Sequence, residues 1–373
     1  MHKQKIIIIS AINIFEGGPL SILNDNLTFI NNETSNKYLI YVLVHKKELF
    51  NLEILNKINF IEFPKSRKSY IYRLYYEFFY FKKLSKKLEP YLWFSLHDIT
   101  PNVIAKKRVV YCHNATPFKK VKISDLYFQP TVYFFSLFYK YLYKINIKKN
   151  KYIVVQQKWL KDGFEKMFDL DSNKLLVCYP ENNSKINNTL KIKEPNKLKN
   201  IHTFFYPALA RPFKNFEVIG EAVKQLNNLG ITNFQVLITI KGNENRYAKY
   251  IEKKYGKYEN FKFIGKRSFQ EVTNQYEVTD TLIFPSTLET WGLPISEFKP
   301  YNKPIILSDL PFAKETLGMY EKALFFEAND HTKLANIMIS LIKNDNPKFD
   351  ITNIQNEQVL IGWKELYDKI LED

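Results

Sequence analysis

The stretch FPSTLETWGLPISEF, residues 284–298, contains two carboxylates, Glu289 and Glu297, eight positions apart. The apolar run TLIF at 281–284 indicates a buried parallel strand directly before it. Gly292 lets a ligand approach the backbone, and the Leu-Pro pair after it is typical of a helix start with outward-pointing N–H groups. The stretch therefore predicts a strand, a loop that carries Glu289, and a helix with Glu297 in its first turn.

Such a unit would suit a ligand rich in hydroxyl groups, because vicinal hydroxyls donate paired hydrogen bonds that a charged acceptor strengthens. In an open parallel sheet, ligands sit at the carboxyl ends of the strands, where this loop falls. For Glu297 alone, the alternative is an acidic residue that is favoured near a helix N-terminus.

The chain has 373 residues, of which 45% are hydrophobic, enough for two domains with their own cores. Two cysteines exclude a disulfide framework and a zinc pattern, which favours a reducing, cytoplasmic setting. No run reaches the roughly 18 apolar residues of a spanning helix, and the N-terminal run is too short for a signal peptide. The net charge of +17 suits an anionic partner, or it reflects a Lys- and Asn-rich composition bias.

Short apolar runs alternate with amphipathic stretches along the whole chain, which predicts an α/β fold with doubly wound parallel sheets. The predicted strands are 5–10, 38–44, 58–63, 92–96, 108–112, 152–155 and 175–178, then 202–207, 235–240, 261–265, 281–284, 304–308 and 323–327. The polar residues 181–200 form the best linker. We expect an N-terminal domain at 1–195, a second domain at 196–354, and a C-terminal helix, about 355–373, that packs back onto the first.

Arg211 and Lys214 lie in ALARPFKNF, between a predicted strand and a predicted helix. Two cations beside a helix N-terminus suit a diphosphate, because the amides and the helix dipole favour anions and a guanidinium binds two oxygens. Asn215 is a candidate N-cap for that helix. The alternative is a solvated Arg and Lys in a loop.

Other candidates also follow strands. Gly265, Lys266 and Arg267 form a glycine loop that could hold a nucleobase through backbone contacts. Gly17 and Gly18 lie between the first strand and the first helix, where backbone amides can reach a ligand, although the spacing is not GxGxxG.

Three polar residues follow two strands of the first half. His113 is a candidate contact to a hydroxyl or a leaving-group oxygen, or a structural residue that caps a turn with Asn114 and Thr116. His97 and Asp98 could either hold their loop or bind an acceptor.

Four features together resemble family 4 of the retaining glycosyltransferases: EGGPLS at 16–21, HN at 113–114, ARPFKNF at 210–216, and FPSTLETWGLPISEF with its E-x7-E. The match is nearly continuous over 261–318 and looser in the N-terminal half. The resemblance implies a GT-B fold, in which two Rossmann-like domains face across a cleft. It also implies transfer of a sugar from a UDP- or GDP-linked donor, with no cofactor.

The resemblance assigns the site residues. Arg211 and Lys214 would neutralise the donor diphosphate, although their spacing is shorter than in many members. Glu297 would hold the ribose hydroxyls. Glu289, with the amides of Gly292 and Leu293, would hold the transferred sugar.

In the first domain, the resemblance places His113 against that sugar near the reacting carbon, and Gly18 against the diphosphate or the acceptor. Configuration at the anomeric carbon would be retained. No metal is expected, because cations and helix amides take the developing charge. We interpret the D-x-D pattern at 169–171 as a polar turn rather than a metal site.

Two basic, aromatic stretches, 64–90 and 126–149, suggest either interfacial helices on an anionic membrane or amphipathic helices packed on the sheet. A membrane contact would favour a glycan or lipid-diphosphate-linked acceptor at the inner leaflet, as in capsule, lipopolysaccharide or O-antigen assembly. The alternatives are a sugar-nucleotide 2-epimerase of the same architecture, which E-x7-E argues against, and a basic membrane- or nucleic-acid-surface binder, which leaves the two glutamates unexplained.

Overall fold

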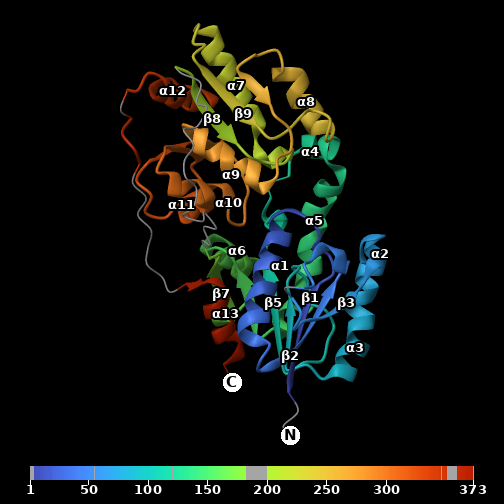
Figure 1. The fold of residues 1–373 in the computed structure, drawn as a ribbon. Coiled ribbons are helices and arrows are strands. Elements are labelled where there is room, and N and C mark those ends of the chain that lie inside the picture. Colours follow the sequence, from blue (N-terminus) through green and yellow to red (C-terminus); the bar gives the residue numbers. More distant parts are fainter. Residues whose placement is uncertain are drawn as a thin grey trace. The chain divides into compact units, whose positions relative to one another are not determined.

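The computed structural model describes residues 4–53, 55–119, 121–181, 200–345, 347–350 and 359–372 (Figure 1). The chain divides into two compact units, and each is assembled from separate parts of the sequence. Unit 1 consists of Met1–Phe118, Ser136–Glu181 and Glu357–Asp373, and unit 2 consists of Lys119–Phe135 and Asn182–Asn356. The predicted boundary at 195/196 lies outside the described residues.

Unit 1 is built on an eight-stranded sheet in the order β14-β7-β6-β5-β4-β1-β2-β3, and all its strand pairs are parallel. The strands are β1 (Lys5–Ala11), β2 (Tyr38–Val44), β3 (Asn59–Glu62), β4 (Leu92–Ser95), β5 (Lys107–Cys112), β6 (Tyr152–Val155), β7 (Leu175–Tyr179) and β14 (Leu360–Ile361). The order reverses between β1 and β4, which makes the sheet doubly wound.

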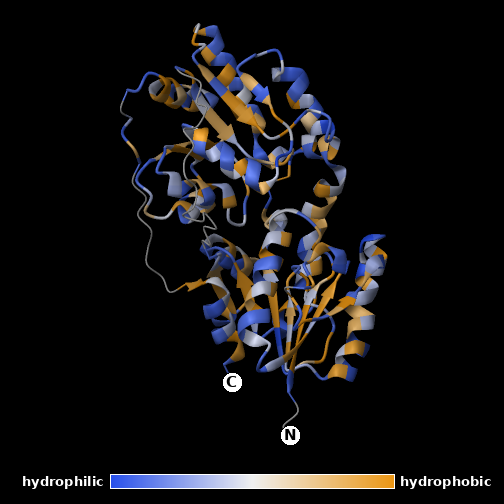
Figure 2. Ribbon diagram, in the orientation of Figure 1, coloured by the Kyte–Doolittle hydropathy of each residue, from blue (hydrophilic) through white to orange (hydrophobic). Residues whose placement is uncertain are grey.

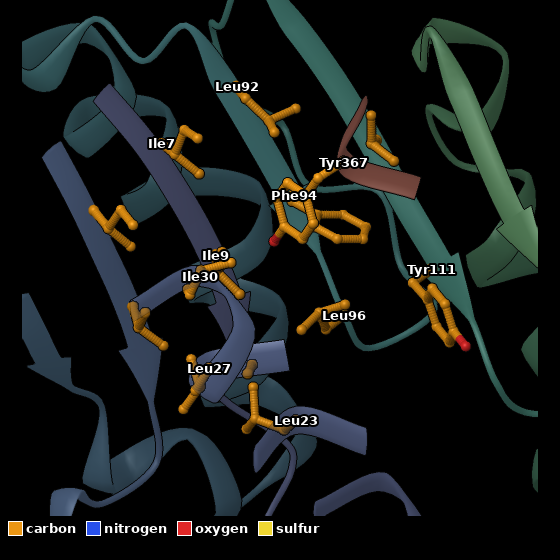
Figure 3. Packing of buried hydrophobic residues seen from close by; sticks show 14 of the residues in the cluster. Ile7, Ile9, Leu23, Leu27, Ile30, Leu92, Phe94, Leu96, Tyr111 and Tyr367 are labelled. Atoms are coloured by element: carbon orange, nitrogen blue, oxygen red, sulfur yellow. The ribbon is translucent and has the colours of Figure 1, made fainter. Parts of the chain in front are cut away.

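Helices cover both faces of this sheet. They are α1 (Gly17–Phe29), the π-helices η1 (Ile30–Thr34) and η4 (Tyr76–Tyr80), α2 (Tyr70–Tyr75), α3 (Phe81–Leu88), α6 (Lys158–Phe168) and α13 (Gly362–Leu371), with the 3-10 turns η2 (Lys47–Leu49), η3 (Pro64–Arg67), η5 (Thr116–Phe118), η6 (Ile147–Lys149) and η7 (Ser172–Lys174). On one face, side chains of α1 and α13 meet those of β1 and β4 (Figure 3). On the other, Phe63 and Phe81 pack with Trp93. The strands are therefore apolar on both sides (Figure 2), as buried parallel strands require.

The C-terminal helix α13 belongs to unit 1. Asn26 Nδ2 donates to Tyr367 Oη at 3.1 Å, which joins α13 to α1. The buried Lys107 ammonium donates to the carbonyl of Ile370 at 3.3 Å, near the helix C-terminus, where a cation is favoured by the helix dipole. Before α13, Leu360 pairs with Cys178 in a two-residue strand that the sequence analysis took for helix.

Unit 2 repeats the winding on six parallel strands in the order β10-β9-β8-β11-β12-β13. The strands are β8 (His202–Tyr206), β9 (Phe234–Ile238), β10 (Phe261–Phe263), β11 (Thr281–Phe284), β12 (Ile305–Ser308) and β13 (Ala323–Phe326). The helices are η8 (Pro212–Lys214), α7 (Phe216–Asn228), α8 (Arg246–Tyr255), α9 (Phe269–Val278), α10 (Leu293–Phe298), η9 (Lys299–Tyr301), α11 (Pro311–Leu317) and α12 (His331–Ile342). Here the order reverses between β8 and β11.

Unit 2 also contains a segment from the N-terminal half of the chain, which the sequence analysis did not foresee. Helix α4 (Ile123–Phe128) lies in unit 2, and α5 (Pro130–Lys144) begins there and ends in unit 1. The Phe128 ring lies 5.4 Å from Tyr247 and 5.1 Å from Tyr250, centroid to centroid. The backbone carbonyl of Tyr127 accepts a hydrogen bond from Arg246.

Each of the thirteen predicted strands is present, and β2, β6 and β11 have the predicted bounds. No helix within the described ranges has the length and apolarity needed to cross a membrane.

Candidate functional site

The reversal of strand order in unit 2 brings two loops together, one after β8 and one after β11. The first carries Arg211 and Lys214, and the second carries Glu289. The Lys214 ammonium forms an ion pair with Glu289 Oε1, and the two side chains keep 16% and 13% of their surface exposed. The fold therefore joins two predicted site residues that lie 75 positions apart.

Hydrogen bonds fix these two loops to each other. The hydroxyl of Tyr206, the last residue of β8, donates to the Lys214 carbonyl at 2.9 Å and lies 2.8 Å from Ser286 Oγ. The Thr287 amide donates to the Phe213 carbonyl at 2.8 Å. The Lys214–Glu289 pair is thus preorganised, because its backbone cannot move without breaking these bonds. Sequence reasoning missed Tyr206, whose position at a strand end was the available signal.

The Arg211 side chain is partly exposed, and no carboxylate of the described residues pairs with its guanidinium. The carbonyl just before it, that of Ala210, accepts hydrogen bonds from Gln129 Nε2 at 3.1 Å and Asn245 Nδ2 at 2.8 Å. Two side chains remote in sequence therefore hold the backbone from which Arg211 projects.

Asn215 is the N-cap residue of α7, as predicted, but it lies in the left-handed region, with φ of 58°, and its side chain makes no capping bond. Its amide instead donates to the carbonyls of Pro285 at 3.2 Å and Ala328 at 2.7 Å. An N-cap side chain accepts from the helix when the residue is extended, and the left-handed backbone turns this one toward the neighbouring loops.

Gly292 precedes α10 with φ of 88°, a conformation that only glycine adopts readily. A Cβ there would lie 3.1 Å from Ile295 Cδ1, so the position is also crowded. Helix α10 begins at Leu293, which makes Glu297 its fifth residue rather than part of the first turn as predicted.

Glu297 lies beside α9, and its Oε2 accepts a hydrogen bond from Tyr276 Oη at 2.9 Å. Burial raises the pKa of the Glu297 carboxyl, and the Tyr276 hydrogen bond partly offsets this rise by stabilising the charged form. The carboxylate is therefore held in place by a partner from another helix.

The glycine loop after β10 has the predicted strand–loop–helix form. Gly265 has φ of 75°, and its amide donates to the Ile240 carbonyl at 3.2 Å. Lys266 and Arg267 are exposed, and Arg267 Nη1 lies 3.2 Å from Glu271 Oε1 on the first turn of α9. In this structure the Arg267 guanidinium is thus engaged with its own helix.

In unit 1, His97 follows β4 and is 1% exposed. Its Nε2 lies 2.9 Å from Ser10 Oγ and 3.3 Å from Glu77 Oε1, while Arg73 Nη2 donates to its carbonyl at 3.1 Å. Burial, together with the charge of Arg73, lowers the pKa of the His97 imidazole well below its usual value. His97 could either hold its loop or bind an acceptor, and these contacts are those of a residue that holds its loop.

Asp98 links this loop to His113. Its backbone is left-handed, with φ of 71°, and its Oδ1 accepts from the His113 amide at 2.8 Å. His113 Nδ1 is buried without a hydrogen-bond partner among the described residues. The turn of Asn114 and Thr116 closes through the Asn114 side chain, which accepts from the Thr116 amide at 2.9 Å. The His113 ring takes no part in closing that turn.

Gly17 and Gly18 are the first residues of α1, and Gly17 has φ of 67°. In the D-x-D pattern, Asp169 pairs with Lys148 at 2.9 Å and Asp171 accepts from the Asn173 amide, so both carboxylates serve a surface turn. No three His, Cys, Asp or Glu side chains gather as metal ligands would within the described part of the chain.

Known proteins resemble this chain in sequence and in fold. The family model described as glycosyl transferases group 1 matches residues 187–357. The O-antigen chain mannosyltransferase RfbU of Salmonella typhimurium strain LT2 is 24% identical over 280 residues, which cover 69% of this chain and 73% of that protein.

Among solved structures, a glycosyltransferase from Rickettsia africae superposes with a TM-score of 0.66 at 15% identity, covering 92% of this chain and 90% of its own. HepE of Anabaena, solved with UDP and glucose, has a TM-score of 0.61 at 14% identity, with 92% and 91% covered. WaaG, a glycosyltransferase involved in lipopolysaccharide biosynthesis, has a TM-score of 0.62 at 12% identity, with 91% and 94% covered. At these identities the structures establish the fold.

Proposed function

We propose that this chain, whose residues 187–357 match the model of group 1 glycosyl transferases and whose fold is that of the GT-B glycosyltransferases, moves a sugar from a UDP- or GDP-linked donor to a glycan or lipid-linked glycan acceptor in capsule- or O-antigen-type polysaccharide biosynthesis. The observation that carries the proposal is the meeting of Arg211, Lys214 and Glu289 in the two loops at the strand reversal of unit 2. The O-antigen relative and the HepE complex with UDP and glucose support the class of product and of donor.

The cations act on the donor diphosphate. As the bond to the anomeric carbon breaks, negative charge grows on the β-phosphate oxygen, and preorganised cations stabilise that charge most in the transition state. Arg211 has a guanidinium that no described carboxylate neutralises, so it can bind two phosphate oxygens. Lys214 is paired with Glu289 in the free protein. Donor binding would separate this pair, with Lys214 turning to the diphosphate and Glu289 to the sugar hydroxyls.

Glu297 binds the ribose hydroxyls of the donor. Tyr276 fixes one oxygen of its carboxylate, which keeps the side chain oriented and leaves the second oxygen for the ligand. The amides of Gly292 and Leu293 support Glu289 at the transferred sugar. The loop of Gly265, Lys266 and Arg267 contacts the nucleobase through its backbone.

His113 contacts the transferred sugar near the reacting carbon, and Gly17 and Gly18 approach the diphosphate or the acceptor. The unpartnered, buried Nδ1 of His113 supports a role in binding, because a buried nitrogen without a partner is costly unless a ligand supplies one. The anomeric configuration is retained. The reaction needs no metal, because the cations and amides named above carry the charge that a metal would take.

The membrane is proposed to meet α2, η4 and α3. Large apolar side chains on the outer side of this segment are exposed: Tyr70, Ile71, Tyr72, Tyr75, Phe79 and Tyr80. Seven cations between residues 64 and 88 are exposed as well: Lys65, Arg67, Lys68, Lys82, Lys83, Lys86 and Lys87. Of the two acidic residues in the predicted stretch 64–90, Glu77 is fully buried and Glu89 is exposed. Aromatic side chains beside an excess of exposed cations suit an anionic inner leaflet, where a lipid-linked acceptor would be held.

The decisive experiment is sugar transfer by the Arg211→Ala variant. A thermal-shift screen of sugar nucleotides first identifies the donor, since a ligand at 100 times its dissociation constant stabilises by about 2.7 kcal/mol. With saturating donor, Arg211→Ala should lose roughly 10²- to 10³-fold in turnover. Lys253→Ala, which removes an exposed cation of α8, is the matched control and should keep full turnover.

Near-normal turnover of Arg211→Ala would refute the proposed site. Loss of activity on addition of EDTA would refute the metal-free reaction. Absence of sedimentation with anionic vesicles at low salt would refute the membrane contact.

A further inference from the structure

Two charged side chains of unit 1 are buried under the α2–η4 segment. Arg73 is 3% exposed and Glu77 is fully buried, and they lie one helical turn apart. Arg73 Nε and Glu77 Oε1 are 3.9 Å apart, too far for a hydrogen bond. Within the described residues, Arg73 Nε and both Glu77 carboxylate oxygens have no hydrogen-bond partner.

Such a pair contributes little to stability. Burial raises the pKa of Glu77 to about 8, although the charge of Arg73 opposes the rise, so removal from water outweighs the mutual attraction. Buried ion pairs can often be replaced by apolar side chains of similar volume without loss of stability. The segment is also a π-helix at Glu77, a local geometry that is frequent at functional sites. Because stability does not explain the Arg73–Glu77 pair, we looked at which parts of the structure the two residues contact.

The pair holds the loop that follows β4. Arg73 Nη2 donates to the His97 carbonyl at 3.1 Å and to Tyr139 Oη at 3.4 Å. Glu77 Oε1 lies 3.3 Å from His97 Nε2, and the Glu77 carbonyl accepts from the Asn102 amide at 2.9 Å. Side chain and backbone of the segment thus fix both ends of this loop.

The residue after His97 is the left-handed Asp98. This conformation is uncommon outside glycine, although aspartate adopts it more readily than most residues, and here tertiary contacts hold it. Here Arg73 holds the carbonyl before Asp98, and the Tyr111 carbonyl accepts the Asp98 amide at 3.2 Å. The Asp98 carboxylate is thereby aimed at the His113 amide, 2.8 Å away.

We propose that Arg73 and Glu77 are positioning residues for sugar transfer: they hold the His97–Asp98 turn so that Asp98 fixes the backbone of His113. The inference rests on the proposed contact between His113 and the transferred sugar. Neither residue of the pair touches the substrate. The effect of Arg73 passes through two hydrogen bonds, from Arg73 to His97 and from His113 to Asp98. Glu77 contributes through its backbone carbonyl, which accepts from the Asn102 amide of the same loop.

Hydrogen–deuterium exchange gives a readout that does not depend on activity. In Arg73→Met, the His113 amide, followed in a peptide covering residues 109–118, should exchange roughly 10-fold faster than in the wild type. Turnover at saturating donor should fall roughly 10- to 100-fold, the effect of displacing a reacting group by about an ångström. Donor affinity, measured by calorimetry with UDP or GDP, should stay within about twofold, because the diphosphate cations lie in unit 2. Arg73→Lys should restore part of the turnover, since an ammonium can still donate to the His97 carbonyl.

Asn26→Leu is the matched control. Asn26 is a fully buried polar residue of the same unit whose amide bonds Tyr367 on α13, away from this loop. It should lower the melting temperature and leave the exchange of the 109–118 peptide and the turnover per folded molecule unchanged.

The positioning role is refuted if Arg73→Met leaves both readouts at wild-type values, or changes them only as much as Asn26→Leu does. Should Arg73→Met not fold, Arg73→Lys carries the same test: only part of the turnover is expected back, so wild-type values of both exchange and turnover in this variant refute the role. Full turnover by His113→Ala would instead overturn the proposed function of His113. The exchange result would still test whether Arg73 and Glu77 hold the backbone of His113.

Discussion

Replacing Gly292 by alanine tests whether the turn before α10 is fixed by both conformation and crowding. A left-handed backbone costs a residue with a Cβ about 1–2 kcal/mol. The new Cβ would lie 3.1 Å from Ile295 Cδ1 and 3.4 Å from Phe284 Cε1, both in the core. Overpacking of this kind costs about 1–3 kcal/mol. The Gly292→Ala variant should therefore lose about 2–5 kcal/mol of the free energy of unfolding.

Gly230 separates the two contributions. It has φ of 71°, and a Cβ built on it meets nothing within 4 Å. Gly230→Ala should lose only the conformational part, about 1–2 kcal/mol. For a domain the size of unit 2, a loss of 1 kcal/mol lowers Tm by about 2–4 °C. Circular dichroism melts of the two variants should therefore differ by at least about 2 °C, with Gly292→Ala the less stable.

Activity gives a second comparison between the two variants. Relief of the contact at Gly292 must shift the backbone that leads to Leu293 and Glu297, so the Kd for donor should rise in Gly292→Ala. Gly230→Ala should bind donor as the wild type does. Equal melting temperatures for the two variants would refute the crowding argument, and an unchanged donor Kd in Gly292→Ala would refute the role given to this turn.

Two further predictions concern the partners of the site. Tyr276→Phe removes a hydrogen bond that lowers the pKa of Glu297, so that pKa should rise further above its usual value. Donor binding needs the ionised carboxylate, so on acidification the variant should lose donor affinity at a higher pH than the wild type. Calorimetry across pH measures this, and coinciding profiles of the two proteins would contradict it. Gln129→Ala removes one of the two side-chain amides that donate to the Ala210 carbonyl. Turnover should fall several-fold, while Tm should fall by no more than a few degrees, since one hydrogen bond contributes about 1 kcal/mol. Wild-type turnover in steady-state assays would contradict this prediction.

Most strands were predictable because they are buried on both faces and are rich in apolar residues, whereas the edge strand β3 is partly exposed. Their positions therefore follow from composition, and for β2, β6 and β11 the bounds do as well. The two-residue strand β14 was missed because its pairing with β7 depends on a partner about 180 residues earlier in the chain. The proximity of Lys214 and Glu289 could be expected, because each follows a strand on one side of the reversal in unit 2.

Other parts of the site left no local signal. The hydrogen bond from Gln129 to Ala210 joins residues 81 positions apart, and nothing in the sequence around Gln129 marks it. Asn215 occupies the predicted N-cap position, but its side chain makes no capping bond because contacts with Pro285 and Ala328 decide its direction. Asp98 and His113 were noticed separately, but their bond depends on a left-handed backbone that tertiary contacts impose.

Residues 119–135 belong to unit 2, and this matters for the construction of chimeric glycosyltransferases. A unit 2 transplanted from one glycosyltransferase to another by splicing near residue 200 would leave this segment behind with the recipient. The graft would then lack its own Phe128 against Tyr247 and Tyr250, and its own Gln129 beneath Arg211. Chimeras meant to exchange unit 2 should therefore exchange two stretches of sequence together.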